Sequence, residues 1–342
     1  MPKLHLLSLD QKALEEFAAG HGEPRFRARQ LHEWMYRHLE TDFRRMTNLP
    51  KKWIEKLEAD AEITTLTVQS RQDSVDGTRK WAFRTQDGHV FETVLIPSGD
   101  RRSLCVSSQV GCAMGCTFCR TATMGFIRNL TLGEIVEQIH YAARVVREED
   151  GTRLSNVIFM GMGEPLHNLE NVARACEVLN SEDGFGIGKG HITVSTSGIV
   201  PKIMEWAQRA PDFKLAISLN GSNDTVRSSV MPVNRRWNIA SLLAAADDYI
   251  RITGQKLTFE YVLIRGVTCT PEAARELRHI AANRNCKINL IPLNKGENPA
   301  LQPPDEDEIL AFETILRQGD FEVLRRRPRG PDILAACGQL AI

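Results

Sequence analysis

The chain has 342 residues, of which 42% are hydrophobic and 25% charged, a composition typical of a globular protein with one large and one smaller domain. Its 43 basic and 43 acidic residues cancel, which excludes a global positive field as the means of attracting nucleic acid. There is no membrane-length apolar run and no N-terminal signal segment, so we expect a cytoplasmic protein without membrane contact.

Residues 1–85 predict a small helical domain that also contains short strands. Apolar residues recur at helical spacing from Phe26 to Leu39, and Pro50 is placed where a second helix would begin. Short strands are expected at 63–68, 81–84 and 90–96, where Asp-Gly turn signals separate them.

From residue 104 onward, strand patterns alternate with helical ones such as 132–146. The expected strands are Leu104–Val110, Asn156–Met160, His191–Ser195, Lys214–Leu219, Leu257–Leu263 and Lys287–Leu293. Six such units predict an α/β fold in which residues 86–342 form a partial (β/α)6 barrel. In barrels of this kind, functional residues follow the C-terminal ends of the strands.

Three cysteines, Cys112, Cys116 and Cys119, follow the first expected strand with the spacing Cys-x3-Cys-x2-Cys. Soft thiolates at short spacing select zinc or an iron–sulfur cluster, and no fourth cysteine lies close by. Structural zinc is the alternative, but the nearest downstream histidine, His140, lies inside an expected helix. The spacing is that of radical S-adenosylmethionine (SAM) enzymes, in which the open iron of one [4Fe–4S] cluster binds SAM.

Other candidates lie at later strand ends and near the C-terminus. Gly163 and Glu164 belong to a glycine-rich segment after the second strand, which is either a ligand loop or a simple turn. Cys337, beside glycine in the C-terminal segment, is poorly explained by core packing. Cys105, on the first strand, taken alone is best explained as a small buried hydrophobic residue.

Several segments together resemble the radical-SAM RNA adenine methyltransferases, the RlmN/Cfr family, over nearly the whole chain. These segments are Cys105–Cys112, Gly161–Pro165, Ser195–Gly198, Ile288–Pro292 and Ala335–Leu340. The RlmN branch is the more similar. It implies methylation of C2 in adenosine 2503 of 23S rRNA and adenosine 37 of certain tRNAs. The alternatives are C8 methylation, as in the Cfr branch, and a non-catalytic RNA-binding paralogue.

The resemblance implies a radical mechanism that consumes two SAM molecules. Cys337 takes a methyl group from one SAM, and a second SAM yields the 5′-deoxyadenosyl radical that activates the methylated Cys337. Cys105 then resolves the RNA–protein adduct through a transient disulfide with Cys337, and Glu92 is the proton acceptor.

The resemblance also implies ligand contacts and partners. The SAM contacts are Gly163, Glu164, Ser195, Ser218, Leu219, Asn220 and Asn294. Asn220 stands where the family usually has histidine, and the segment 295–299 also departs from the family pattern. The basic residues themselves, rather than the resemblance, indicate RNA contacts: a run beside Cys337, whose alternative is a solvated strand end, and a second patch in the N-terminal domain. These residues are Arg325, Arg326, Arg327 and Arg329, together with Arg25, Arg27, Arg29, Lys51 and Lys52. An electron donor such as flavodoxin is the further expected partner.

Overall fold

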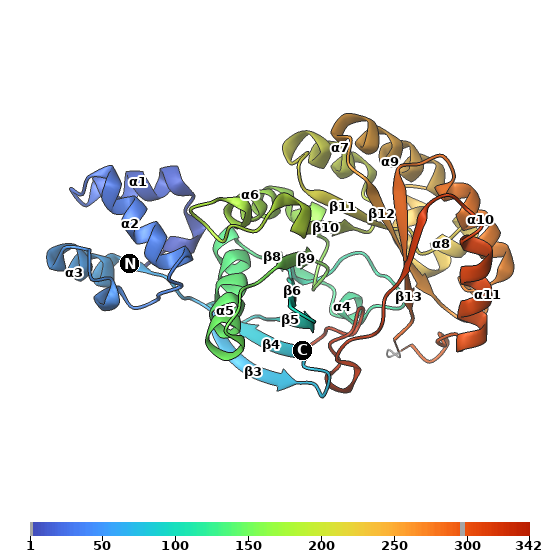
Figure 1. Cartoon of the computed structure of the whole chain (residues 1–342), viewed down its shortest axis with the longest axis horizontal. Helices are drawn as coiled ribbons and strands as arrows, with labels where there is room; N and C mark the ends of the chain where they lie inside the picture. Colours follow the sequence, from blue (N-terminus) through green and yellow to red (C-terminus); the bar gives the residue numbers. More distant parts are fainter. Residues whose placement is uncertain (1–2, 295–297) are drawn as a thin grey trace.

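A ten-stranded sheet runs through most of the chain, in the order β14-β13-β12-β11-β10-β9-β6-β5-β4-β3 (Figure 1). The structure is a computed structural model, and it describes residues 3–294 and 298–342. The strands that pair in parallel are β6 (Arg101–Cys105), β9 (Asn156–Phe159), β10 (Ile192–Thr196), β11 (Lys214–Ser218), β12 (Leu257–Leu263), β13 (Cys286–Pro292) and β14 (Glu322–Arg325). The predicted partial barrel is therefore confirmed, with β14 as an additional edge strand. Its pattern was too weak to predict because only Val323 is buried.

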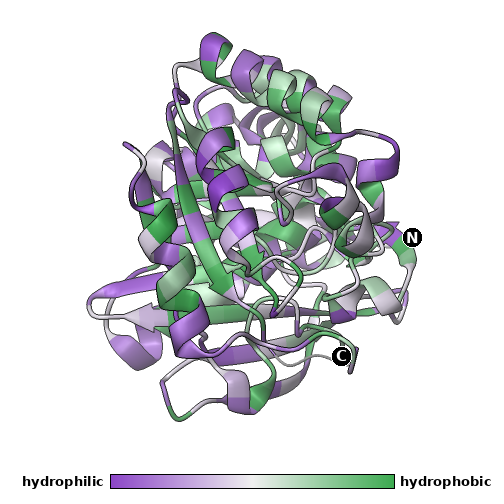
Figure 2. Ribbon diagram, turned by 90° about the vertical axis from the view of Figure 1, so that its right-hand side faces the viewer, coloured by the Kyte–Doolittle hydropathy of each residue, from purple (hydrophilic) through white to green (hydrophobic). Residues whose placement is uncertain are grey.

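Helices cover the outer face of the parallel strands. They are α5 (Leu132–Asp150), α6 (Leu169–Asn180), α7 (Val200–Arg209), α8 (Asp224–Val230), α9 (Ile239–Thr253), α10 (Pro271–Ala281) and α11 (Glu306–Leu316). Hydrophobic residues run along the central strands, whereas the outer faces of the helices are more hydrophilic (Figure 2). The predicted apolar stripe of α5 is buried, and its first turn is closed by a capping box between Thr131 and Glu134.

The antiparallel strands β3 (Thr67–Asp73), β4 (Arg79–Arg84) and β5 (Val90–Ser98) extend the same sheet past β6. The proposed domain boundary after residue 85 falls in the turn between β4 and β5, which are hydrogen-bonded neighbours. The sheet is thus continuous across this boundary.

The first barrel strand is shorter than predicted. Instead of running from Leu104 to Val110, β6 ends at Cys105, and β7 (Gln109–Gly111) pairs with β8 (Phe126–Asn129) in a separate sheet. The backbone leaves the main sheet because Ser107 N donates to the side chain of Gln138 on α5 at 2.9 Å. The cysteine loop therefore begins from β7.

The N-terminal helices α1 (Gln11–Gly20), α2 (Arg25–Tyr36) and α3 (Lys51–Asp60) pack at one end of the molecule (Figure 1). Pro50 is the N-cap residue of α3, as predicted. Strands β1 (Leu4–His5) and β2 (Ala61–Glu62) pair in parallel and join the two ends of this unit. Among the described residues, no helix combines the length and apolar character needed to cross a lipid bilayer.

Candidate functional site

The three motif cysteines line one cavity at the C-terminal ends of the barrel strands. They lie in the loop between β7 and β8, which includes the short helix α4 (Arg120–Thr123). Within the described residues, no three His, Cys, Asp or Glu side chains converge on a position for a single metal ion. A cubane cluster does not need such convergence, because each thiolate binds its own iron.

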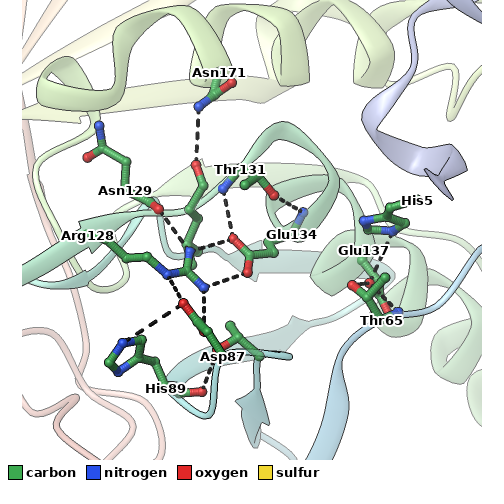
Figure 3. Close-up of polar contacts among 12 residues, drawn as sticks. His5, Thr65, Asp87, His89, Arg128, Asn129, Thr131, Glu134, Glu137 and Asn171 are labelled. Atoms are coloured by element: carbon green, nitrogen blue, oxygen red, sulfur yellow. Dashed lines mark hydrogen bonds and ion pairs between the residues drawn. The ribbon is translucent and has the colours of Figure 1, made fainter. Parts of the chain in front are cut away.

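An ion-pair network fixes the strand that leads out of this loop. Arg128 on β8 lies between Asp87 and Glu134, as Figure 3 shows. Its Nη2 atom donates to Asp87 Oδ1 at 2.9 Å and to Glu134 Oε1 at 2.7 Å. The guanidinium holds the pKa of Asp87 below its usual range. The network thereby joins the cysteine loop to α5 and to the β4–β5 turn.

The predicted SAM contacts converge on the same cavity, with one exception. Its wall includes Gly163, Glu164, Ser195, Ser218, Asn220 and Asn294. Leu219 is the exception, because its side chain is fully buried in the hydrophobic core and does not reach the cavity wall. The segment 295–299, which departs from the family pattern, lies partly outside the described residues, since 295–297 are not among them.

Glu164 is a buried carboxylate that joins two strand ends. Its Oε2 atom accepts from Ser197 N at 2.7 Å, and its Oε1 atom accepts from Leu166 N at 3.1 Å. Gly163 has a φ of +101°, and a Cβ at this position would lie 2.5 Å from Gln109 Cβ. Glycine is therefore required at position 163, because any side chain there would clash with Gln109 and would have an unfavourable φ.

Asn220 and Asn294 line the cavity, and the side chain of each also forms a hydrogen bond with the backbone of another segment. Asn220 has a φ of +50°, a region that asparagine tolerates well, and its Oδ1 atom accepts from Val262 N at 2.9 Å. Asn294 Nδ2 donates to the carbonyl oxygen of Cys337 at 3.1 Å. The C-terminal segment is thus tied to the end of β13.

Unpaired polar atoms show that the cavity suits a polar ligand. Ser197 Oγ and Glu260 Oε2 are buried, belong to residues of the cavity wall and have no hydrogen-bond partner among the described residues. Buried polar groups usually have partners, so these two atoms are free to bind a ligand. Together with three soft thiols, they fit a site for an iron–sulfur cluster and SAM.

A second cavity adjoins the first, and Cys337 lines both of them. Cys105 lines only the second cavity, and the two thiols are close enough to interact electrostatically. The structure therefore brings together the two cysteines that are distant in sequence. Burial raises the pKa of Cys105 to about 12, and burial also raises the pKa of Cys337, against the effect of Arg326.

The backbone of the segment after Cys337 is hydrogen-bonded to the cysteine loop. Arg120 N donates to Gly338 O at 2.8 Å, and Thr121 Oγ1 donates to Leu340 O at 2.6 Å. These contacts attach the tail to α4, directly after Cys119.

Glu92 is buried on β5 and is not among the residues that line either cavity. Its Oε1 atom forms a buried ion pair with Lys80 Nζ at 2.9 Å, and its Oε2 atom has no hydrogen-bond partner within residues 3–294 and 298–342. Lys80 Nζ also donates to Leu334 O at 3.4 Å, three residues before Cys337. The predicted proton acceptor is therefore next to the tail but not in contact with the cavities.

Three of the four C-terminal arginines have carboxylate partners, which weakens their predicted role as RNA contacts. Arg325 pairs with Glu306, Arg329 lies 3.9 Å from Asp76, and Arg326 pairs with Glu260 at 3.1 Å. All four arginines still line the second cavity. Arg327 is exposed, and it forms no ion pair within the described chain. It remains the best placed to meet a phosphate.

Sequence patterns gave no indication of three further residues, namely Lys80, Arg227 and Glu260. Each is a charged side chain on a strand or helix that propensity alone would place at the surface, and each is buried. Their partners lie on other elements, so local spacing carries no signal for them. An unusually apolar neighbourhood, as in Phe259 and Tyr261 around Glu260, is the only local indication.

Comparisons with known proteins agree with this geometry. Residues 4–63 match the ribosomal RNA large subunit methyltransferase N-terminal domain, and residues 106–277 match the radical SAM superfamily. The dual-specificity RNA methyltransferase RlmN 2 of Myxococcus xanthus is 47% identical over 98% of this chain and 89% of its own length. The corresponding RlmN of Geobacter sulfurreducens is 45% identical over 98% and 90%.

A solved structure extends the likeness to the fold. The crystal structure of a radical SAM methyltransferase from Sphaerobacter thermophilus superposes with a TM-score of 0.95 at 46% identity. The match covers 98% of this chain and 99% of that one. The chain therefore belongs to the RlmN family of dual-specificity RNA methyltransferases, within the radical SAM superfamily.

Proposed function

We propose that this protein methylates C2 of adenine in 23S rRNA and tRNA, with Cys337 as the carrier of the methyl group. The observation that supports this most strongly is the position of Cys337 in the wall shared by two cavities. One cavity contains the cluster cysteines and the unpaired polar atoms, and the other contains Cys105 and the arginine-rich strand end. A carrier residue needs access to both the methyl donor and the nucleic acid.

The cofactor site would use the residues of the first cavity. Cys112, Cys116 and Cys119 would hold a [4Fe–4S] cluster, and Glu164 would accept from the amino group of SAM. Ser195, Ser218 and Asn294 would contact the remaining polar groups of SAM. The bound cluster and SAM would supply the 5′-deoxyadenosyl radical, with electrons from a donor such as flavodoxin.

Cys337 and Cys105 would perform the protein's part of the transfer. The Cys337 thiolate would attack the methyl carbon of SAM, forming an S-methyl thioether while the sulfonium–methyl bond breaks and S-adenosylhomocysteine leaves. After the carbon has been joined to adenine, the adduct would give up the ring proton and one electron. The Cys105 thiolate would then attack Cys337 Sγ, forming a disulfide while the bond between Cys337 Sγ and the transferred carbon breaks; that carbon would keep the electron pair and take up a proton, which releases the RNA with its methyl group. Proton transfer to Glu92 would require Lys80 or the tail segment to move, because Glu92 lines neither cavity and is paired with Lys80.

Cysteine variants test this scheme. After anaerobic reconstitution with SAM, a reductant and either RNA, digested RNA should contain 2-methyladenosine for the wild type and none for Cys337→Ala. Cys105→Ala should accumulate an RNA–protein adduct. Cys286→Ala, at the far end of β13 from Pro292, is the matched control and should keep activity. Release of methylated RNA by Cys105→Ala at the normal rate would refute the resolving role, and 8-methyladenosine alone would refute C2 as the target.

A further inference from the structure

Arg227 is a fully buried arginine that the proposed mechanism does not use. Its relative exposure is 0%, and no carboxylate forms an ion pair with it among residues 3–294 and 298–342. Burying a charge without a counter-charge is expensive unless surrounding dipoles or a ligand compensate for it. The position of this guanidinium therefore requires an explanation beyond simple packing.

The hydrogen bonds of Arg227 join the ends of two strands that line the cofactor cavity. Its Nε atom donates to Leu219 O at 2.8 Å, and Nη2 donates to Ser197 O at 2.6 Å. Nη1 donates to Asn234 Oδ1 at 2.9 Å. Each of these acceptors is neutral, and Asp224, a carboxylate that acts on Arg227 from the start of α8, is exposed and forms no ion pair with it in the part of the chain that the structure describes. Burial lowers the pKa of Arg227 to about 10, which leaves it protonated at neutral pH.

The backbone around Arg227 is shaped to admit it. A Cβ at Gly198 would lie 3.0 Å from Arg227 Nη2, and a Cβ at Gly221 would lie 2.6 Å from Arg227 Cα. Gly198 also has a φ of +102°. Glycine at both positions therefore leaves room for α8 and its arginine against the strand ends, which explains the glycine of the Ser195–Gly198 segment.

The cysteine loop rests on the same helix. Thr117 N donates to Val230 O at 3.0 Å, at the last residue of α8. Cys116 packs against the apolar cluster that contains Val230 and Met231, and it lies within electrostatic reach of Arg227. Cys116 lines the cavity and Arg227 does not, so the buried guanidinium is separated from the cavity by the surrounding protein.

We propose that Arg227 is a positioning residue that makes the iron–sulfur cluster easier to reduce, by placing a fixed positive charge behind Cys116 while it holds the ends of β10 and β11. This inference rests on the proposed function, because it assumes a cluster on the three motif cysteines. Reduction adds negative charge to a thiolate-bound cluster. A nearby cation in a poorly solvated environment lowers the free energy of that step.

The test is a redox titration of the anaerobically reconstituted full chain, followed by electron paramagnetic resonance in the absence of SAM. Arg227→Gln removes the charge but can still donate hydrogen bonds. Its ratio of reduced to oxidised cluster at a fixed potential should fall roughly tenfold, a shift of about 59 mV for one electron. Arg227→Lys keeps the charge and should stay within about twofold of the wild type. The inference is overturned if Arg227→Gln titrates like the wild type, or if Arg227→Lys shifts equally.

Two further variants separate charge from structure. Asn234→Ala removes one hydrogen bond of Arg227 without changing any charge, so it should leave the potential unchanged. Asp224→Asn removes an exposed negative charge that acts on Arg227, so it should make reduction easier. This opposite shift tests the inference even if Arg227→Gln does not fold, and its absence counts against the inference. A wild-type protein that binds no iron and sulfide would instead refute the proposed function.

Discussion

The ion pair between Lys80 and Glu92 offers a quantitative test of how the sheet supports the site. Lys80 Nζ lies 2.9 Å from Glu92 Oε1, and the two side chains are only 10% and 4% exposed. Lys80→Met would leave a buried carboxylate whose other oxygen already has no hydrogen-bond partner in the described part of the chain. Removing one member of a buried pair typically costs about 3–5 kcal/mol, and we expect a loss of this size in the free energy of unfolding.

A double-variant cycle isolates the charge effect from the loss of packing. In Lys80→Met/Glu92→Leu, both charges are gone, so most of the loss should be recovered. Urea denaturation followed by tryptophan fluorescence is a suitable assay, because Trp81 is fully buried next to Lys80. A loss below about 1 kcal/mol for Lys80→Met would refute the reasoning, since it would place the pair among solvated surface pairs.

A surface pair provides the matched control for this experiment. Lys189 and Asp212 form an ion pair whose side chains are 51% and 58% exposed. Lys189→Met should therefore change the free energy of unfolding by less than about 1 kcal/mol, because water compensates for the lost partner. The contrast between the two lysine variants measures the effect of burial on the same chemical change.

The remaining predictions concern a buried histidine and a loop glycine. Burial lowers the pKa of His140 to about 4, so the folded state resists protonation while the unfolded state binds a proton below about 6.5. Stability from this group is present above pH 6.5 and is lost as the pH falls toward 4; between pH 7 and 5 the loss should be about 2 kcal/mol. Urea titrations of wild type and His140→Gln should differ by this amount, and equal pH slopes would contradict the assignment. Gly163→Ala should lower the free energy of unfolding by about 1–2 kcal/mol more than the control Gly254→Ala does. Both glycines have a positive φ, but only Gly163 faces a close neighbour, Gln109. Equal losses in the same urea titrations would show that the contact with Gln109 relaxes freely.

Sequence predicts best those parts of the site whose residues lie close together along the chain. The cysteine loop and the run around Gly163 keep their ligand candidates within a few residues, so the chain itself brings them together. The parallel strands are also predictable, because both of their faces are covered and their apolar runs are continuous; all seven residues of β12 are buried. We expected the first barrel strand to continue because Val106 and Val110 extend the strand pattern beyond Cys105, but the backbone N–H of Ser107 donates to the side chain of Gln138.

Long-range pairing accounts for what sequence did not predict. Arg326 looks like one member of a basic run, yet it meets Glu260, 66 residues away in the sequence. The sequence of β4 does not reveal which face of the sheet Lys80 is on. Lys80 is buried, and its ammonium group contacts Leu334 of the C-terminal segment. Such contacts follow from the arrangement of whole elements, so no local pattern in a single sequence can reveal them.

Hydrogen bonds to the C-terminal segment determine where the Cys337 thiol lies relative to the cysteine loop. Arg120 and Thr121, which directly follow Cys119, hold the backbone of Gly338 and Leu340. Asn294 at the end of β13 holds Cys337 itself. The position of the Cys337 thiol is therefore set by the same loop that carries a predicted cluster ligand, so any rearrangement of that loop on cluster binding must also move the thiol. Because Cys337 lies between the two cavities, even a small rotation of its side chain would direct the thiol toward one cavity or the other.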